Sequence, residues 1–337
     1  MTTTDPTPLE QSEARPGPIQ VMRRIVATPA VGPFIALVLT MAFFSFKSDR
    51  FLQGQNLSLV LQQVMVVGVL AIGQTLVILT AGIDLSVGTV MAFGQIVMTK
   101  LAVANGVDPL LALLLGILAC VGFGFLNGAL VTGVRLPAFI VTLGTLNIAF
   151  ALTHIVSNDL TFAPLPSVLG YFGRTFTIGH TDITYGVVLM LVLFAVTWFA
   201  LNQTAWGRHV YAVGDNPEAA RLTGIKTNRV LLSVYTVAGL TYGIAAMLLV
   251  ARTGIGDPNA GQTTENLDSI TAVVLGGTSL FGGRGTVIGT LIGAVIVGVF
   301  RNGLTLIGVE VIYQYLVTGI LVILAVSVDQ LVHRRRL

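Results

Sequence analysis

The sequence predicts an all-α, polytopic membrane protein with about ten transmembrane helices, some of them broken or half-spanning. Of its 337 residues, 54% are hydrophobic and only 10% are charged, whereas a soluble domain carries about 25% charged residues. The apolar residues also fall in runs close to the ~20 residues that a helix needs to cross a bilayer. The 38 glycines suit helices that pack closely in lipid. A chain of this composition cannot bury its apolar surface in a core of its own.

Ten apolar segments with soft edges are the predicted spans. Two of them are irregular, because 84–103 follows 58–80 almost at once and 268–282 is short and ends in a Gly-Gly pair. Glycine weakens a helix interior, so we expect broken or half-spanning helices at both places. The ten segments are 30–46, 58–80, 84–103, 109–131, 138–157, 183–201, 230–250, 268–282, 285–306 and 311–328.

The chain is predicted to be one transmembrane domain, residues 23–333, between two polar ends. Residues 1–22 form a polar, Pro-rich tail without the apolar stretch of a signal peptide, and we expect this tail to be disordered and cytoplasmic. Residues 334–337 form a basic cytoplasmic end. Lys and Arg accumulate on the cytoplasmic side of membrane proteins. With the N-terminus inside, ten spans place twelve of the 18 Lys and Arg inside, so both termini are predicted to be cytoplasmic.

The predicted cytoplasmic loop, residues 202–229, contains the signals of one short helix. Asp215 or Asn216 can cap its start, and Pro217 suits its first turn. Gly224 suits a left-handed exit, which gives a helix over 217–223. A helix of about two turns is marginal alone in water, so it either docks on a partner or is an ordinary capped loop helix packed on its own chain. The residues of this loop that we assign to docking are Asp215, Asn216, Pro217, Glu218, Ala219, Ala220, Arg221 and Gly224.

Several short motifs, spread in order over about residues 30–330, identify a family. They are GIDLSVG at 82–88, NG at 127–128, LPAFIVTLG at 136–144, WGRHVYAVG at 206–214, EAA followed by Gly at 218–224, and VLGGTSLFGGRGT at 274–286. The EAA…G pattern resembles the coupling loop of ABC-importer permeases. Together the motifs resemble the ribose/xylose/fructose group of sugar ABC permeases, and the amino-acid sequence of residues 204–215 is most similar to fructose-type members.

The resemblance implies a membrane permease subunit that moves a monosaccharide across the bacterial inner membrane, from periplasm to cytoplasm. It implies pairing with a second permease copy or a close relative, of which we expect the homodimer. It also implies cytoplasmic ABC ATPase subunits on the inside loops and a periplasmic sugar-binding protein outside. ATP and Mg are expected on the ATPase partner, because no G-x-x-x-x-G-K-[ST] phosphate loop occurs in this sequence. With one Cys, four scattered His and a net charge of +3, we expect no metal site, no catalytic site and no nucleic-acid partner.

The stretch ILTAGIDLSVGTV, residues 78–90, places one carboxylate, Asp84, inside a long apolar region. A charge there is costly unless it caps a helix, pairs with a cation or meets water. Three interpretations are open. Asp84 can cap the helix that starts there, it can face the pathway and meet sugar hydroxyls, or it can pair with a cation such as Arg135 or Arg284.

Amides, hydroxyls and small residues at apolar positions are the candidates for the translocation path or for the broken helices, because a sugar is neutral and rich in hydroxyls. For each one alone, a helix-to-helix hydrogen bond is the alternative role. An ion-coupled secondary transporter is the competing function, although intramembrane acids are nearly absent from the sequence. The candidates are Gln74, Asp84, Ser86, Asn127, Thr145, Asn147, Gly276, Gly277 and Asn302.

Overall fold

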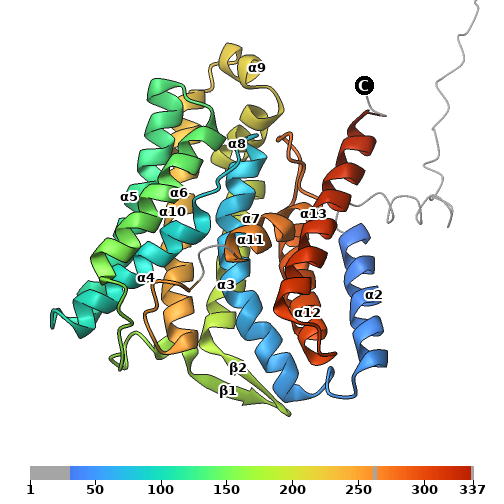
Figure 1. The fold of residues 1–337 in the computed structure, drawn as a ribbon. Coiled ribbons are helices and arrows are strands. Elements are labelled where there is room, and N and C mark those ends of the chain that lie inside the picture. The colour runs from blue at the N-terminus through green and yellow to red at the C-terminus, as the bar shows by residue number, and fades with distance from the viewer. Residues whose placement is uncertain (1–30, 261–263, 335–337) are drawn as a thin grey trace, which may run out of the picture.

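The computed structural model describes residues 31–260 and 264–334, and it shows a bundle of helices with a two-stranded hairpin at one end (Figure 1). Helices α3 (Gly54–Leu79) and α10 (Thr227–Thr253) lie at the centre, since most of their residues are buried. The short helix α9 (Pro217–Leu222) lies at the end of the bundle opposite to the hairpin. The predicted disordered tail, residues 1–22, lies outside the described residues.

The remaining elements surround this central pair. The π-helical turn Leu130–Val134 continues α5. The other helices and strands are α2 (Val31–Lys47), α4 (Val87–Val103), α5 (Pro109–Ala129), α6 (Ala138–Ser157), α7 (Tyr185–Gln203), α8 (Ala205–Asp215), α11 (Thr264–Leu275), α12 (Val287–Leu306), α13 (Val311–Arg334), the 3-10 turn Tyr171–Gly173, β1 (Thr175–Ile178) and β2 (Thr181–Thr184).

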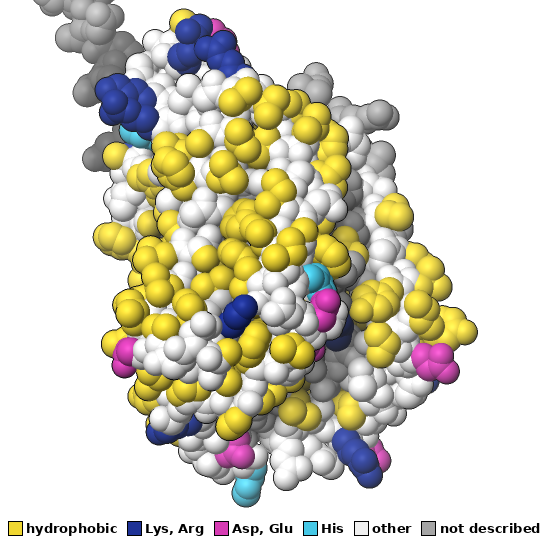
Figure 2. All heavy atoms as spheres, turned by 60° about the vertical axis from the view of Figure 1, so that its left-hand side comes forward, with side chains coloured by type: hydrophobic (Ala, Val, Ile, Leu, Met, Phe, Trp, Pro, Cys, Tyr) yellow, Lys and Arg dark blue, Asp and Glu magenta, His cyan; other side chains and the backbone are white. Residues whose placement is uncertain are grey.

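The helices confirm a polytopic membrane protein. Six of the described helices are long and apolar enough to cross a bilayer, namely α3, α5 with its π turn, α6, α7, α10 and α12. Shorter apolar helices occur at Val31–Lys47, Val87–Val103 and Val311–Ile320. Figure 2 shows a broad apolar surface, with Lys and Arg gathered at its upper end and charged side chains of both signs scattered over its lower end. The number of spans, about ten, remains a prediction.

Helices dominate the fold, as the sequence predicts, and β1 and β2 form one short antiparallel hairpin between α6 and α7. Two predicted segments need correction. The segment predicted to begin at residue 84 begins its helix at Val87, since the preceding residues are held in an extended turn by side chains of other helices. The segment 268–282 is instead the helix Thr264–Leu275. It ends before the glycines, and Gly277 takes a left-handed φ of +82°.

Glycine allows α5 and α10 to approach closely. A Cβ atom on Gly124 would lie 2.3 Å from the carbonyl oxygen of Tyr235 and 2.9 Å from the Cα of Gly239. Two residues earlier on the same helix, a Cβ on Gly122 would meet nothing within 4 Å. Small residues at such contacts are what holds membrane helices together, because lipid supplies no hydrophobic drive between them.

We therefore expect Gly124→Val to destabilise the detergent-solubilised protein, while Gly122→Val leaves it unchanged. Overpacking a well-packed interior costs about 1–3 kcal/mol, and here the obstacle is backbone that cannot rotate away. The midpoint of thermal unfolding, followed by size-exclusion chromatography, measures the difference. Both variants add the same side chain to the same helix, so equal midpoints would contradict this account of the contact.

Candidate functional site

The break between α3 and α4 is built around Asp84, whose side chain is fully buried. Helix α3 ends at Leu79, and Ala81 follows with a left-handed φ of 59°. One carboxylate oxygen of Asp84 accepts hydrogen bonds from the backbone N–H and the hydroxyl of Ser86, at 2.8 and 2.6 Å. The other accepts from the Tyr242 hydroxyl of α10 at 3.0 Å. The carboxylate thus holds a tight turn before the helix.

This geometry revises the interpretation of Asp84 as a helix cap. Ser86, not Asp84, occupies the N-cap position of α4, and the carboxylate reaches only the N–H of Ser86. No ion pair of Asp84 occurs among the described residues, and Arg135 and Arg284 are both exposed. Asp84 is therefore a structural acceptor for a turn and for a hydroxyl on α10.

Three neighbouring helices hold the backbone of the same break. The carbonyl oxygen of Ile83 accepts from the Thr142 hydroxyl of α6 at 3.0 Å. The Asp84 carbonyl accepts from the Gln74 amide of α3 at 3.0 Å, and the Leu85 carbonyl accepts from the Asn266 amide of α11 at 2.7 Å. Backbone groups inside a membrane need such partners, because water is absent. An irregular segment is thereby fixed at the junction of α3, α6 and α11.

The break also keeps unused polar atoms. Four buried atoms around it have no hydrogen-bond partner among the described residues: Oε1 of Gln74, Oδ1 of Asn127, Oδ1 of Asn266 and the hydroxyl of Tyr235. Native proteins leave few buried polar atoms unpaired. The cluster can therefore accept further hydrogen bonds from water or from a polar solute.

The structure brings some predicted path residues together and separates others. The Asn127 amide of α5 donates to the Ser86 hydroxyl at 3.2 Å, so Gln74, Asp84, Ser86 and Asn127 form one group. Thr145 is buried on α6, where it bonds its own helix.

Two other predicted path residues lie elsewhere. Asn147 is exposed and donates to Leu143 within its own helix. Asn302 exchanges amide hydrogen bonds of 2.8 and 2.9 Å with Asn56, near the start of α3. These two do not belong to the break.

The second break follows α11 and contains Gly276 and Gly277. A Cβ on Gly276 would lie 2.5 Å from the carbonyl carbon of Gly289, so this glycine allows α12 to pack against the end of α11. The chain then runs as an irregular segment to Thr286, the N-cap of α12. Both glycines thus serve the broken helix that the sequence predicts, with Gly276 in a helix contact and Gly277 in a left-handed turn.

The predicted docking helix is present as α9. The Asn216 side chain caps it, accepting from the N–H groups of Glu218 and Ala219 at 3.1 and 2.9 Å. Pro217 is its first residue, and Gly224 leaves it with a φ of +88°. Asp215, the other predicted cap, ends α8 instead.

One face of α9 is exposed. Ala220 is buried against the chain, whereas Ala219 and Leu222 are exposed, Leu222 to 78%. Arg221 pairs with Glu218 at 2.6 Å, and this contact holds the pKa of Glu218 below its ordinary value. The pair is therefore intact above the ordinary carboxyl pKa and is lost only as pH falls through the lowered value.

Helix α8, which precedes α9, contacts both helix breaks. A Cβ on Gly214 would lie 1.7 Å from the carbonyl oxygen of Leu79 and 2.7 Å from the backbone nitrogen of Gly283. The N–H of Gly283 donates to the Leu79 carbonyl at 2.9 Å, and the Tyr211 hydroxyl donates to the Gly285 carbonyl at 3.0 Å. Movement of α8 and α9 would therefore act directly on both breaks.

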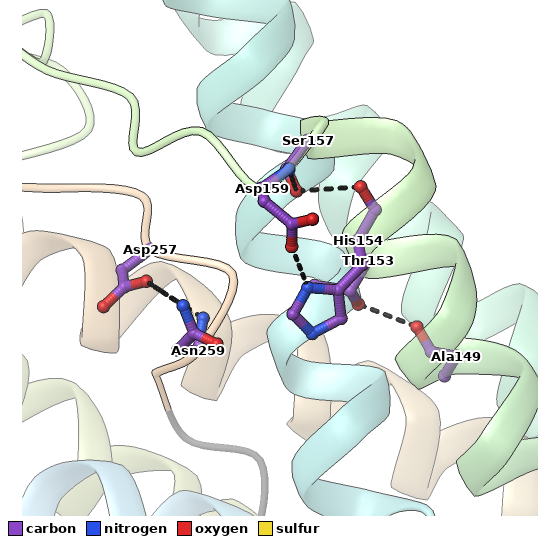
Figure 3. A network of polar contacts seen from close by, with 7 residues as sticks. All are labelled: Ala149, Thr153, His154, Ser157, Asp159, Asp257 and Asn259. Carbon is purple, nitrogen blue, oxygen red and sulfur yellow. Dashed lines mark hydrogen bonds and ion pairs between the residues drawn. The ribbon is translucent and has the colours of Figure 1, made fainter.

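At the opposite end of the bundle, loops from distant parts of the chain meet. Phe162 and Gly256 pair through two backbone hydrogen bonds. Figure 3 shows the His154 ring from the last turn of α6 directed at Asp159, with Asp257 and Asn259 on the neighbouring loop. This end carries the hairpin and presents polar groups to the solvent.

Sequence reasoning missed several residues of these sites. Tyr242 sits in an apolar helix and has the pattern of a core aromatic, and Asn266 lies just before the predicted segment 268–282. It also missed Asp268, which is buried on α11 and pairs with Arg301 of α12. Among the described residues, no group of three or more His, Cys, Asp or Glu is placed to hold a metal ion.

Comparison with known proteins finds sugar transport permeases that match nearly the whole chain. The chain is 45% identical to the fructose import permease protein FrcC of Rhizobium meliloti, over 91% of this chain and 87% of that protein. It is 40% identical to the ribose import permease protein RbsC of Bacillus subtilis, over 89% and 92%. It is 35% identical to the D-allose transport system permease protein AlsC of Escherichia coli, over 90% and 92%.

No solved structure matches the chain. The family described as branched-chain amino acid transport system / permease component matches residues 56–326. That match covers most of the chain, including both helix breaks and the α8–α9 element, and the chain therefore belongs to this family of transport permeases.

Proposed function

We propose that this chain is the membrane permease of an ATP-binding-cassette importer that moves a monosaccharide from the periplasm to the cytoplasm. The observation that carries the proposal is the contact of α8 with both helix breaks, next to the exposed helix α9. The sequence has no phosphate loop, so ATP would be hydrolysed by another chain. A cytoplasmic ATPase bound to α9 can move α8 and with it both helix breaks, and a sugar-binding protein can deliver the solute at the hairpin end.

The solute is proposed to be a sugar, although the family description names branched-chain amino acids. The three relatives above are named for fructose, ribose and allose, and they match nearly the whole chain. A ketose or pentose of the fructose or ribose type is the substrate class that these relatives favour.

The mechanism follows from the backbone contacts among α8, the end of α3 and the segment after α11. ATP-driven closure of the ATPase pair moves α9, and α8 carries that movement to the end of α3 and to the segment after α11. Both breaks are packed backbone to backbone against α8, so they shift as discrete units rather than bending smoothly. The pathway then opens alternately to the periplasm and to the cytoplasm. A second permease copy completes the complex in the inner membrane, and both termini are cytoplasmic.

Gentle purification from native membranes, followed by mass spectrometry of the bound proteins, tests this assembly. The proposal expects a stoichiometric ATPase with a phosphate loop, and two permease copies for each complex. Binding of a monosaccharide by a co-purified binding protein would support the substrate class. A chain that purifies without any ATPase under conditions that preserve other membrane complexes would contradict the proposed function.

A further inference from the structure

A cavity of about 240 Å³ lies among α3, α10, α11, α12 and α13. Arg252, one of its lining residues, is in the last turn of α10. Gly256, four residues further on, pairs with Phe162 of the hairpin loop. The cavity therefore lies toward the hairpin end of the bundle, opposite to α9. Its size is just below the ~300 Å³ at which pockets for larger organic ligands begin, which suits a small solute.

Charged groups of both signs line the cavity in equal number. Arg301 of α12 donates to Asp268 of α11, and the Asp268 side chain is only 3% exposed while that of Arg301 is 30% exposed. Arg252 and Glu265 line the same cavity. Two guanidinium groups and two carboxylates leave no net charge, so the cavity favours neither an anion nor a cation. It offers fork-shaped donors and carboxylate acceptors, which are the groups that bind hydroxyls.

Uncharged polar groups complete the lining. Gln63 of α3 lines the cavity, and its buried Oε1 has no hydrogen-bond partner among the described residues. Gln314 and Thr305 also line the cavity, and the Gln314 amide donates to the Thr305 hydroxyl at 3.1 Å. Ionisable groups inside a membrane are costly and mark pathways when they face a cavity. A buried ion pair adds little net stability, so this lining is better explained by a polar ligand than by folding.

Helix α11 connects this cavity to the first break. Asp268 and Asn266 are two residues apart on α11, and the Asn266 amide donates to the Leu85 carbonyl beside Asp84. The segment after α11 contacts α8 through Gly283 and Gly285. The short helix α11 thus contacts both the cavity and the first break.

We propose that this cavity is the site that receives the neutral sugar from the hairpin end, with the Asp268–Arg301 pair and Gln63 as its hydroxyl-binding groups. This assignment rests on the proposed function and adds its solute site. It moves that site away from Asp84 and Ser86, which do not line the cavity. α11 forms the barrier that the movement of α8 opens.

Cysteine labelling tests the assignment, because the only native cysteine, Cys120, is buried. Thr305→Cys places a thiol at the cavity, and Ile307→Cys is the matched control at the same end of α12, exposed but outside the lining. Complexes in proteoliposomes, with ATP inside, are treated from the hairpin side with a membrane-impermeant methanethiosulfonate reagent. Val311→Cys, also in the lining, is a second probe if Thr305→Cys disturbs the bond from Gln314.

The expected result is that modification of Thr305→Cys lowers sugar uptake at least about tenfold, whereas modification of Ile307→Cys leaves it unchanged. Sugar-loaded binding protein should slow the modification of Thr305→Cys and not that of Ile307→Cys. Unchanged uptake after complete modification of both lining cysteines would overturn the assignment. ATP-driven uptake by the unsubstituted chain tests the proposed function separately, and its absence would overturn both.

Discussion

Replacing Asp84 by Leu is expected to leave little folded protein in the membrane. The carboxylate accepts from the N–H and hydroxyl of Ser86 and from the hydroxyl of Tyr242. A buried donor left without a partner costs about 1–3 kcal/mol, and three such donors lie together here. Their combined loss approaches the whole stability of a typical domain, about 5–15 kcal/mol. Membrane abundance and a monodisperse size-exclusion peak measure the effect.

Asp84→Asn is the control for this substitution. Its amide oxygen can still accept from Ser86, so the turn before α4 should form and most folded protein should return. Sugar uptake should then return in proportion to abundance. A folded, abundant and inactive Asp84→Asn protein would instead show that the charge itself acts in transport. Normal abundance of Asp84→Leu would contradict the structural role of Asp84.

Leu222→Glu is expected to separate the permease from its ATPase without disturbing the permease fold. The Leu222 side chain is 78% exposed at the end of α9, so a carboxylate there meets water in the isolated chain. In a complex it would lie in the interface, where loss of an anchoring apolar side chain costs about 2 kcal/mol or more. That cost corresponds to a roughly 30-fold loss of affinity.

Co-purification of the ATPase and ATP-dependent uptake measure this second effect, with Leu222→Met as the conservative control. Leu222→Met should keep both, because its side chain is apolar and of similar volume. Thermal unfolding of the permease should be the same in all three proteins. Full ATPase binding by Leu222→Glu would remove α9 from the docking surface.

The parts of the site that the sequence predicted depend on local chemistry. Asn216, Pro217 and Gly224 fix α9 through a cap, a first-turn residue and a left-handed exit, all within a few residues. The break after α11 is equally local, because Gly276 and Gly277 directly follow its last residue. The break after α3 is also signalled locally by Gly82, although Ala81 is the residue that takes the left-handed φ of 59°. These signals need no knowledge of the rest of the chain.

The parts that sequence reasoning missed depend on distant contacts. Tyr242 and Asp84 are 158 residues apart in the sequence, and no local pattern near either residue predicts their contact. The Asp268–Arg301 pair joins two helices in the same way. Asn147 lies two residues after the buried Thr145 and so faces the opposite side of α6, and its place in the pathway stays a prediction. The hairpin was hidden because its strands are four residues each in a polar loop.

Import driven by ATP is tested by sugar uptake into proteoliposomes that contain the purified complex, with ATP or ADP inside and ionophores that collapse every ion gradient. The binding protein and a labelled monosaccharide are supplied outside. We expect uptake with internal ATP alone, unaffected by the ionophores and dependent on the binding protein. Uptake that persists with ADP and stops when the ion gradient collapses would contradict it, and would establish an ion-coupled transporter instead.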